Sequence, residues 1–135
     1  MANVQQTLII VKPDGVRRRL IHTVIERIEA KGYEIREMKL FTIDESLAQK
    51  HYAEHSDKPF FQELVSFITS GPVVAMVVEG HEAVKGMREI MGATDPMEAK
   101  PGSIRGYYAT VIGENIVHGS DSPESAEREI NLFFG

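Results

Sequence analysis

The chain has 135 residues, of which 42% are hydrophobic and 26% charged, and it contains no cysteine. This length supports one domain, residues 1–135, and is too short for two. Its formal net charge of −5 provides no overall positive field for holding nucleic-acid phosphates, so strong nucleic-acid binding is not expected. The lack of cysteine excludes disulfides and thiolate metal sites, and it suits a cytoplasmic location.

The N-terminal segment contains an apolar run, Thr7 to Val11, that is followed at once by Lys12 and Pro13. The run predicts a buried strand, stopped by the proline and turned by Asp14-Gly15. It is too short for a signal peptide, and no segment approaches the ~18 apolar residues of a membrane span. We therefore expect no membrane partner.

Helical and strand patterns alternate along the rest of the chain. They predict a helix over 17–32 closed by Gly32, a half-buried strand over 33–43, a helix from near Asp44, a helix over 59–71 begun by Pro59, an apolar central strand over 73–78, a helix over 81–92, a loop over 93–106, a strand within 115–119 and a last helix opened by Ser122-Pro123. This order predicts an α+β sandwich, a sheet with helices packed on one side. The loop is long for so small a domain, and such loops are usually functional.

One short motif points to zinc chemistry. "HYAEH", residues 51–55, fits the pattern H-x-x-E-H of inverted zinc peptidases, in which two histidines bind the metal. That chemistry needs a third metal ligand and a chain large enough to form a peptide-binding cleft. In addition, such short patterns often occur by chance. We therefore interpret His51 as a partly buried helix residue and His55 as a solvated one.

Any phosphate site in this chain must be built from side chains. Neither the P-loop pattern G-x-x-x-x-G-K-[ST] nor the dinucleotide pattern G-x-G-x-x-G occurs in the sequence. Side chains suited to phosphate are present at Lys12, Arg88, Thr94 and Arg105. Each could equally be a solvated surface group, and the sequence alone does not show that they converge.

A histidine and a carboxylate form the most specific candidate pair. His118 ends a short apolar run, and Glu129 lies in the last helix beside its apolar stripe of Ala126, Ile130 and Phe133. A carboxylate on the inner flank of a helix needs a hydrogen-bond partner, which an imidazole N–H supplies. That bond would fix the tautomer and leave the second ring nitrogen free as a nucleophile or base.

Several blocks of the chain together resemble the nucleoside diphosphate kinases. "NIVHGSDS" is similar to the family's active-site signature N-x-x-H-G-S-D, and the likeness extends over essentially the whole chain through "TLIIVKPDGV", "HYAEHSDKPFF", "SGPVVAMVVEG", "MREIMGATDP" and "KPGSIRG". The resemblance implies a ferredoxin-like βαββαβ sandwich with an antiparallel four-stranded sheet, an inserted helical hairpin and a long loop before the last strand. It also implies a homo-oligomer, a tetramer or hexamer built from dimers.

The resemblance assigns roles position by position. It makes His118 the histidine that takes the phosphoryl group, supported by Glu129 and Ser120. It places the other matching side chains around the nucleotide: Tyr52 against the transferred phosphate, Lys12 at the phosphates and the ribose hydroxyl, Asn115 at the 3′-hydroxyl, Arg88, Thr94 and Arg105 as a phosphate clamp, and Phe60 and Ile112 on the two faces of the base.

The implied activity is transfer of the terminal phosphoryl group from a nucleoside triphosphate to a nucleoside diphosphate, ribo or deoxy, in two half-reactions through phospho-His118. Mg²⁺ would arrive on the nucleotide phosphates, with Asp121 at most contacting its waters. Two features depart from the pattern: Tyr107 stands where relatives commonly have Asp, and longer members extend beyond the position of Gly135. Both are expected to affect loop contacts or subunit packing. The alternatives from other classes are a non-catalytic member that binds nucleotides or single-stranded nucleic acid as a regulator, and the zinc peptidase.

Overall fold

The structure, a computed structural model, describes residues 3–135 and is built on a four-stranded sheet. The strands are β1 (Val4–Val11), β2 (Glu34–Phe41), β3 (Val73–His81) and β4 (Val117–Gly119), in the spatial order β2-β3-β1-β4. Each neighbouring pair is antiparallel. The helices are α1 (Pro13–Arg17), α2 (Ile21–Ala30), α3 (Glu45–His51), α4 (Phe61–Ile68), α5 (Ala83–Met91), α6 (Ile104–Tyr108) and α7 (Pro123–Phe134).

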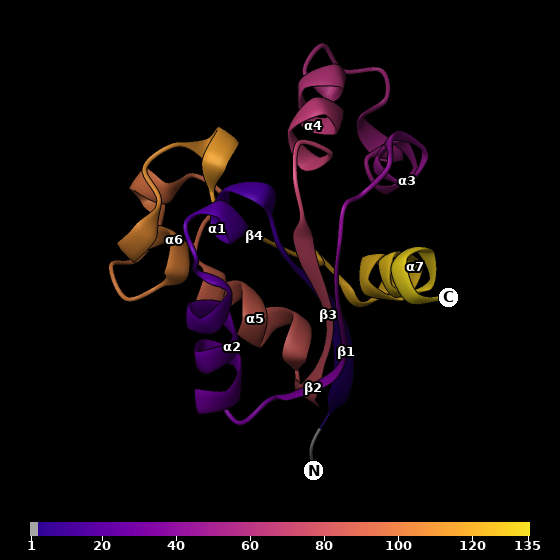
Figure 1. The fold of residues 1–135 in the computed structure, drawn as a ribbon. Coiled ribbons are helices and arrows are strands. Elements are labelled where there is room, and N and C mark those ends of the chain that lie inside the picture. The colour runs from indigo at the N-terminus through magenta and orange to yellow at the C-terminus, as the bar shows by residue number, and fades with distance from the viewer. Residues whose placement is uncertain (1–2) are drawn as a thin grey trace.

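This order of elements is the ferredoxin-like βαββαβ arrangement, and it confirms the predicted fold class. The helices α2 and α5 provide the two crossovers, and α3 with α4 forms the hairpin inserted between β2 and β3. In Figure 1 this hairpin projects beyond the end of the sheet. None of the helices between residues 3 and 135 is long and apolar enough to cross a membrane.

Helices cover both faces of the sheet, whereas the sequence predicted helices on one side. Alternate residues of β1 separate into two buried clusters, because successive side chains of a strand point to opposite faces. Ile9 and Val11 pack with residues of α2 and α5, while Leu8 and Ile10 pack with residues of α3, α4 and α7. Figure 1 shows α2 and α5 on one side of the strands and α7 on the other.

The single helix predicted over 17–32 is two helices. Asp14 and Gly15 lie inside the short helix α1 rather than in a turn. Arg19, with a φ of 60°, then interrupts the helical backbone between α1 and α2. The predicted stop at Gly32 is confirmed. Its φ is +92°, its N–H bonds to the carbonyl of Glu29, and the N–H of Tyr33 bonds to that of Ile28, which is the Schellman pattern.

The segment 93–106 is more ordered than a loop. It contains a 3₁₀ turn, Pro96–Glu98, and it runs into α6, whose first residue, Ile104, is fully buried. The helix predicted over 59–71 begins two residues later, with Phe60 as its N-cap. Strand β2 is also more exposed than predicted, since Met38 is 54% and Leu40 64% accessible.

Candidate functional site

A buried carboxylate holds the imidazole of His118. The β4 residue His118 lies opposite Ile10 of β1, and its Nε2 is 3.0 Å from Oε1 of Glu129. The hydroxyl of Ser120 donates to the same oxygen at 2.8 Å and accepts from the backbone N–H of Leu8 at 3.2 Å. Glu129 and Ser120 are buried, while the His118 side chain is 22% exposed.

The electrostatics of this cluster fix the tautomer of His118. Burial opposes ionisation of Glu129, but hydrogen bonds from His118 and Ser120 and the attraction of His118 outweigh it and hold the pKa of Glu129 below its ordinary value. The ionised carboxylate is an acceptor only, so Nε2 of His118 carries the proton. The lone pair of Nδ1 is therefore the free one.

Lys12 and Asn115 form a second part of the site. Lys12 follows β1, and its ammonium group donates to the side-chain oxygen of Asn115, whose amide in turn donates to the carbonyl of Thr94 at 3.0 Å. Burial lowers the pKa of Lys12 to about 8, with Asp14 opposing the shift and Arg105 adding to it. The lysine is thus protonated at neutral pH and close to titration.

The two arginines of the predicted clamp differ in their surroundings. Arg105 is buried, and its guanidinium donates to the carbonyls of Asn115, Gly92 and Val117 at 3.3, 2.9 and 2.7 Å. Arg88, on α5, is partly exposed and pairs with Asp121 at 2.7 Å. Arg105 therefore also links the segment 93–106 to β4. Arg88, by contrast, can exchange its bond with Asp121 for a bond to another anion.

These residues surround one cavity of about 300 Å³. Its walls include nine of the eleven predicted site residues: Lys12, Tyr52, Arg88, Thr94, Arg105, Ile112, Asn115, His118 and Glu129. Ser120 lies behind Glu129 and does not line the cavity. Phe60 is 43% exposed and also stands outside the lining, with its ring 5.8 Å from that of His55, which does line it. Burial and Glu129 raise the pKa of Tyr52 to about 12, so its phenol remains a donor.

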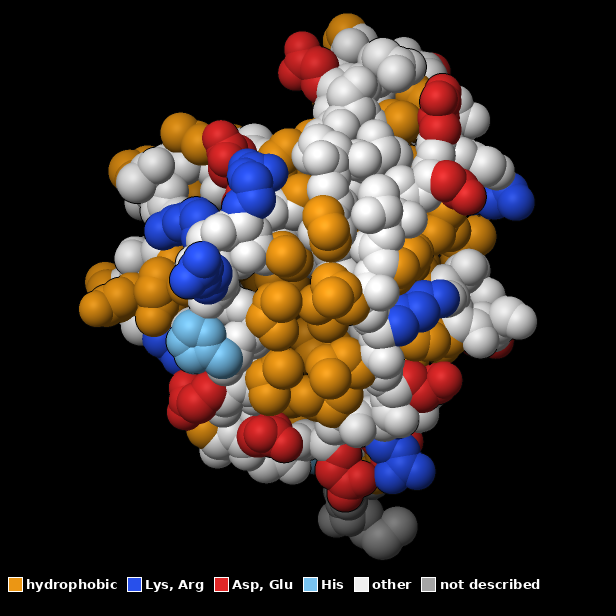
Figure 2. Space-filling view, viewed as in Figure 1, with side chains coloured by type: hydrophobic (Ala, Val, Ile, Leu, Met, Phe, Trp, Pro, Cys, Tyr) orange, Lys and Arg blue, Asp and Glu red, His pale blue; other side chains and the backbone are white. Residues whose placement is uncertain are grey.

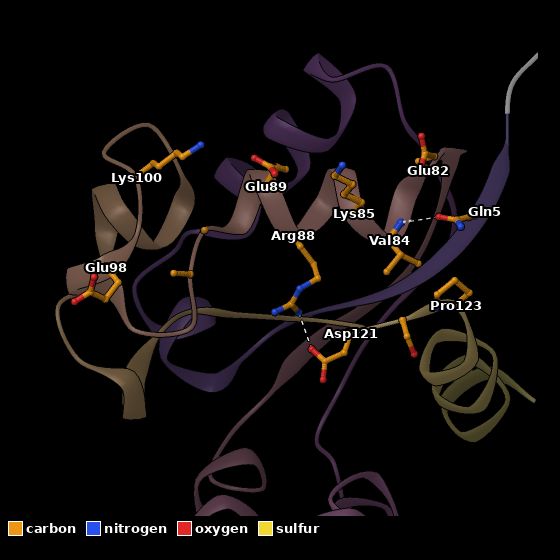
Figure 3. Close-up of a pocket in the computed structure, with 13 residues that line it drawn as sticks. Gln5, Glu82, Val84, Lys85, Arg88, Glu89, Glu98, Lys100, Asp121 and Pro123 are labelled. Carbon is orange, nitrogen blue, oxygen red and sulfur yellow. Dashed lines mark hydrogen bonds and ion pairs between the residues drawn. The ribbon is translucent and has the colours of Figure 1, made fainter.

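A larger cavity of about 580 Å³ lies beside the first and shares Arg88 and Asp121 with it. In the close-up the two side chains point toward each other and a dashed line joins them (Figure 3). This cavity is lined by acidic as well as basic side chains, Glu82, Glu89 and Glu98 among them, and by neither His118 nor Lys12. The smaller cavity has more basic than acidic side chains in its lining, and the larger one has more acidic than basic. A negatively charged polyphosphate therefore suits the smaller cavity better.

Sequence reasoning missed the role of Asp14. Ile116, a β-branched residue two positions before His118, has a φ of 74°, a conformation that such residues rarely adopt. Its buried N–H donates to Asp14 at 3.0 Å, and its carbonyl accepts from the N–H of Lys12 at 2.8 Å. Asp14 thus anchors the bend that leads into β4. Its only signal in the sequence is a carboxylate directly after Pro13.

The zinc-peptidase arrangement of residues 51–55 does not form. The helix α3 ends at His51, and residues 53–55 are a 3₁₀ turn, so the two histidines do not share a helical face. Glu54 is exposed and lies 3.5 Å from Arg128. His55 is half-buried against Phe60 rather than solvated, as the sequence predicted. His51 is buried beside His118, with the ring centroids 4.7 Å apart.

Comparisons with known proteins identify the family of this chain. The family model described as nucleoside diphosphate kinase matches residues 5–135. A nucleoside diphosphate kinase of Parafrankia sp. is 59% identical over 96% of this chain and 95% of its own length. One from Rubrobacter xylanophilus is 59% identical over 97% and 98%.

Solved structures give the same result. A halophilic nucleoside diphosphate kinase from Halobacterium salinarum, solved in complex with CDP, has a TM-score of 0.94 and 55% identity, covering 96% of this chain and 87% of its own. The Aquifex aeolicus nucleoside diphosphate kinase has a TM-score of 0.95 and 46% identity, covering 98% and 96%.

Proposed function

Because this chain belongs to the nucleoside diphosphate kinase family of nucleotide-binding phosphotransferases, we propose that it moves the terminal phosphoryl group of a nucleoside triphosphate onto a nucleoside diphosphate by way of His118. The observation that carries this proposal is the bond between His118 Nε2 and Glu129, which leaves Nδ1 free at a cavity rich in cations. The proposed unit is a single domain that spans residues 1–135.

The proposed chemistry has two half-reactions. In the first, Nδ1 of His118 forms a bond to the γ-phosphorus, the bond to the β–γ bridging oxygen breaks, and the nucleoside diphosphate leaves with that electron pair. In the second, a terminal oxygen of another nucleoside diphosphate attacks the same phosphorus and the N–P bond breaks. The proton stays on Nε2 of His118 throughout, hydrogen-bonded to Glu129. Because Nδ1 carries no proton, His118 needs no separate base to act as the nucleophile.

The surrounding side chains position and neutralise the transferred group, which is most of what phosphoryl transfer requires of a protein. In this proposal Arg88 leaves Asp121 to contact the phosphates, and the Tyr52 phenol donates to an oxygen of the transferred group. Lys12 reaches both the phosphates and the ribose, and Asn115 contacts the 3′-hydroxyl. Thr94 and Arg105 complete the proposed clamp.

Magnesium is proposed to enter with the nucleotide. The acidic side chains along the cavity are already engaged: Asp121 with Arg88, Glu129 with His118, and Glu54 with Arg128 at 3.5 Å. This fits an ion bound mainly to phosphates and waters, with Asp121 contacting it through water. When bound, the ion neutralises phosphate charge.

Broad base tolerance is proposed for the nucleotide site. Ile112 is 55% exposed at the cavity and Phe60 43% exposed next to His55, so both offer apolar surface to a base. A stacked base is held through the π-face that every base has, without contacts to its edge. Purine and pyrimidine nucleotides, ribo and deoxy, should therefore all be accepted.

A homo-oligomer built from dimers, tetrameric or hexameric, is proposed as the working form. Within residues 3–135, β2 has a hydrogen-bonded neighbour on one side only, and it carries the exposed Met38 and Leu40. In Figure 2 hydrophobic side chains gather in the middle of the face drawn, over the strands. An exposed edge with large apolar side chains is a common interface. We propose the cytoplasm as the location, in keeping with a cysteine-free chain.

Initial velocities measured with donor and acceptor varied together test the proposed function. A covalent intermediate separates the two substrates, so double-reciprocal plots should give parallel lines. Converging lines would indicate direct transfer between two bound nucleotides. Absence of any transfer, with nucleotides still bound, would indicate the non-catalytic alternative.

A further inference from the structure

The buried imidazole of His51 is not explained by the proposed reaction. His51 is 5% exposed, and neither of its ring nitrogens has a hydrogen-bond partner among the described residues. Its ring packs edge-on against His118 and against Phe133, with centroid separations of 4.7 and 5.3 Å. Buried polar atoms nearly always have partners, and an unpartnered pair in a native protein often indicates an ion or water.

His51 completes a set of metal-binding donors. One ligand atom each from His51, His118 and Glu129 lie within 4.8 Å of one another. Two imidazoles and a carboxylate are the protein ligands of one class of zinc site, in which the fourth position stays open. We propose that His51, His118 and Glu129 bind a transition-metal dication, Zn²⁺ in particular, and that this ion blocks phosphorylation of His118.

The surroundings of the cluster also suit a metal. Ser120 already donates to Glu129 at 2.8 Å, the kind of outer contact that orients a ligating carboxylate. His51, His118 and Glu129 all line the 300 Å³ cavity, which gives the ion a path of entry. Arg128, 3.7 Å from the other Glu129 oxygen, opposes a second positive charge. Mg²⁺ prefers oxygen ligands and should not occupy the site, whereas an ion that prefers nitrogen ligands gains two imidazoles.

Inhibition follows from the chemistry of imidazole. Neutral imidazole has one lone pair in the ring plane, and in this structure it is on Nδ1 of His118. An ion that replaces the proton between His118 and Glu129 takes the electrons of Nε2, and the ring proton moves to Nδ1. No bond to phosphorus can then form at Nδ1. The metal and the first half-reaction are mutually exclusive.

Equilibrium dialysis of the whole protein against Zn²⁺, with Mg²⁺ in excess, tests the site directly. We expect one tightly held zinc per chain. The variant His51→Phe keeps an aromatic ring between His118 and Phe133 but should bind zinc at least tenfold more weakly, since even outer contacts of a ligand are worth about 10–100-fold. His55→Phe, four residues on, is the matched control and should bind as the parent does.

Phosphorylation gives the second measurement. Zinc should prevent labelling of the parent by γ-labelled nucleoside triphosphate, a chelator should restore it, and labelling of His51→Phe should resist the same zinc concentration. Equal zinc binding by the parent and His51→Phe, or none by either, would overturn the proposal. Labelling in the absence of zinc tests the proposed function separately. A parent that takes up label but binds no zinc disproves the metal site alone.

Discussion

At the scale of single residues, the position of Glu129 decides what His118 does. A carboxylate on the inner flank of α7 is buried next to the stripe of Ala126 and Phe133, and it ionises because His118 and Ser120 bond to it. This relation could be predicted from the sequence, because helical spacing places position 129 beside the stripe. The sequence also predicted His51 as a partly buried helix residue, but it did not show that its ring would contact that of His118.

Replacement of Glu129 by Gln tests that relation. Gln keeps the shape, but it loses the charge and presents either an oxygen or an NH₂ group to His118, so the ring is no longer held in one tautomer. We expect turnover to fall by about 10–100-fold, the effect typical of an outer contact. A steady-state assay with melting as the folding control measures it. Parental turnover would show that Glu129 does not orient the ring.

Lys12 should make nucleotide binding depend on pH. Its pKa of about 8 means that the ammonium is charged below that pH and neutral above it. The affinity for a nucleoside diphosphate should therefore fall as pH rises through about 8, while Lys12→Arg, which stays protonated, should give a flatter profile. Titration calorimetry across this range measures both. Identical profiles would exclude Lys12 from the phosphate site.

The free energy of unfolding should move in the opposite direction. Because burial lowers the pKa of Lys12 from 10.5, the folded chain releases this proton before the unfolded chain does. The unfolded state then binds more protons, so this group makes stability rise with pH between about 8 and 10.5. If nucleotide affinity falls while the free energy of unfolding rises over the same pH range, the weaker binding comes from the loss of a phosphate contact and not from unfolding.

At the scale of elements, local signals predicted the pieces and tertiary packing decided the rest. The strands β1 and β3 follow from continuous apolar runs, and the helices α2, α5 and α7 follow from apolar periodicity. Gly32 ends α2, Gly92 ends α5 and Ser122 opens α7. The break at Arg19 could not be predicted, since arginine gives no local signal for a φ of 60°. Likewise, order in residues 93–106 comes from Arg105, whose bonds reach carbonyls distant in the chain.

The hairpin of α3 and α4 carries a prediction of its own. Phe60 stands at the N-terminus of α4, 43% exposed, and makes an aromatic contact with His55. If it stacks on the base, Phe60→Ala should weaken binding by about 1–3 kcal/mol, to a similar extent for purine and pyrimidine nucleotides. Titration of each nucleotide measures this. A lower melting temperature with unchanged affinity would mean that Phe60 supports the hairpin only.

At the scale of the whole molecule, the exposed edge of the sheet is the feature that an isolated chain leaves unexplained. Met38 and Leu40 of β2 and Tyr107 of α6 are more than half exposed. The sequence pattern predicted β2 as a half-buried strand. A partner chain on this edge would bury Met38 and Leu40 and so give the predicted burial. Tyr107 contacts Tyr108 and is 69% exposed.

Light scattering of an edge variant tests the proposed assembly. Met38→Glu with Leu40→Glu places two negative charges on the exposed edge of β2, where they would be buried unpaired in an interface. The parent should have the mass of four or six chains, and the variant should form a smaller species. Tyr107→Asp changes an exposed residue of α6 that is also expected to affect subunit packing, so it tests a second surface in the same assay. An unchanged mass would show that assembly does not use β2.

The proposed phosphoenzyme is tested most directly by mixing the protein with Mg²⁺ and γ-labelled nucleoside triphosphate, without an acceptor. The first half-reaction needs no second substrate, so label should remain on the protein, be lost in acid and survive alkali, as a phosphoramidate does. Any unlabelled nucleoside diphosphate should discharge it as triphosphate, and folded His118→Ala should take up none. Acid-stable label, or label that persists in His118→Ala, would contradict the assignment of His118.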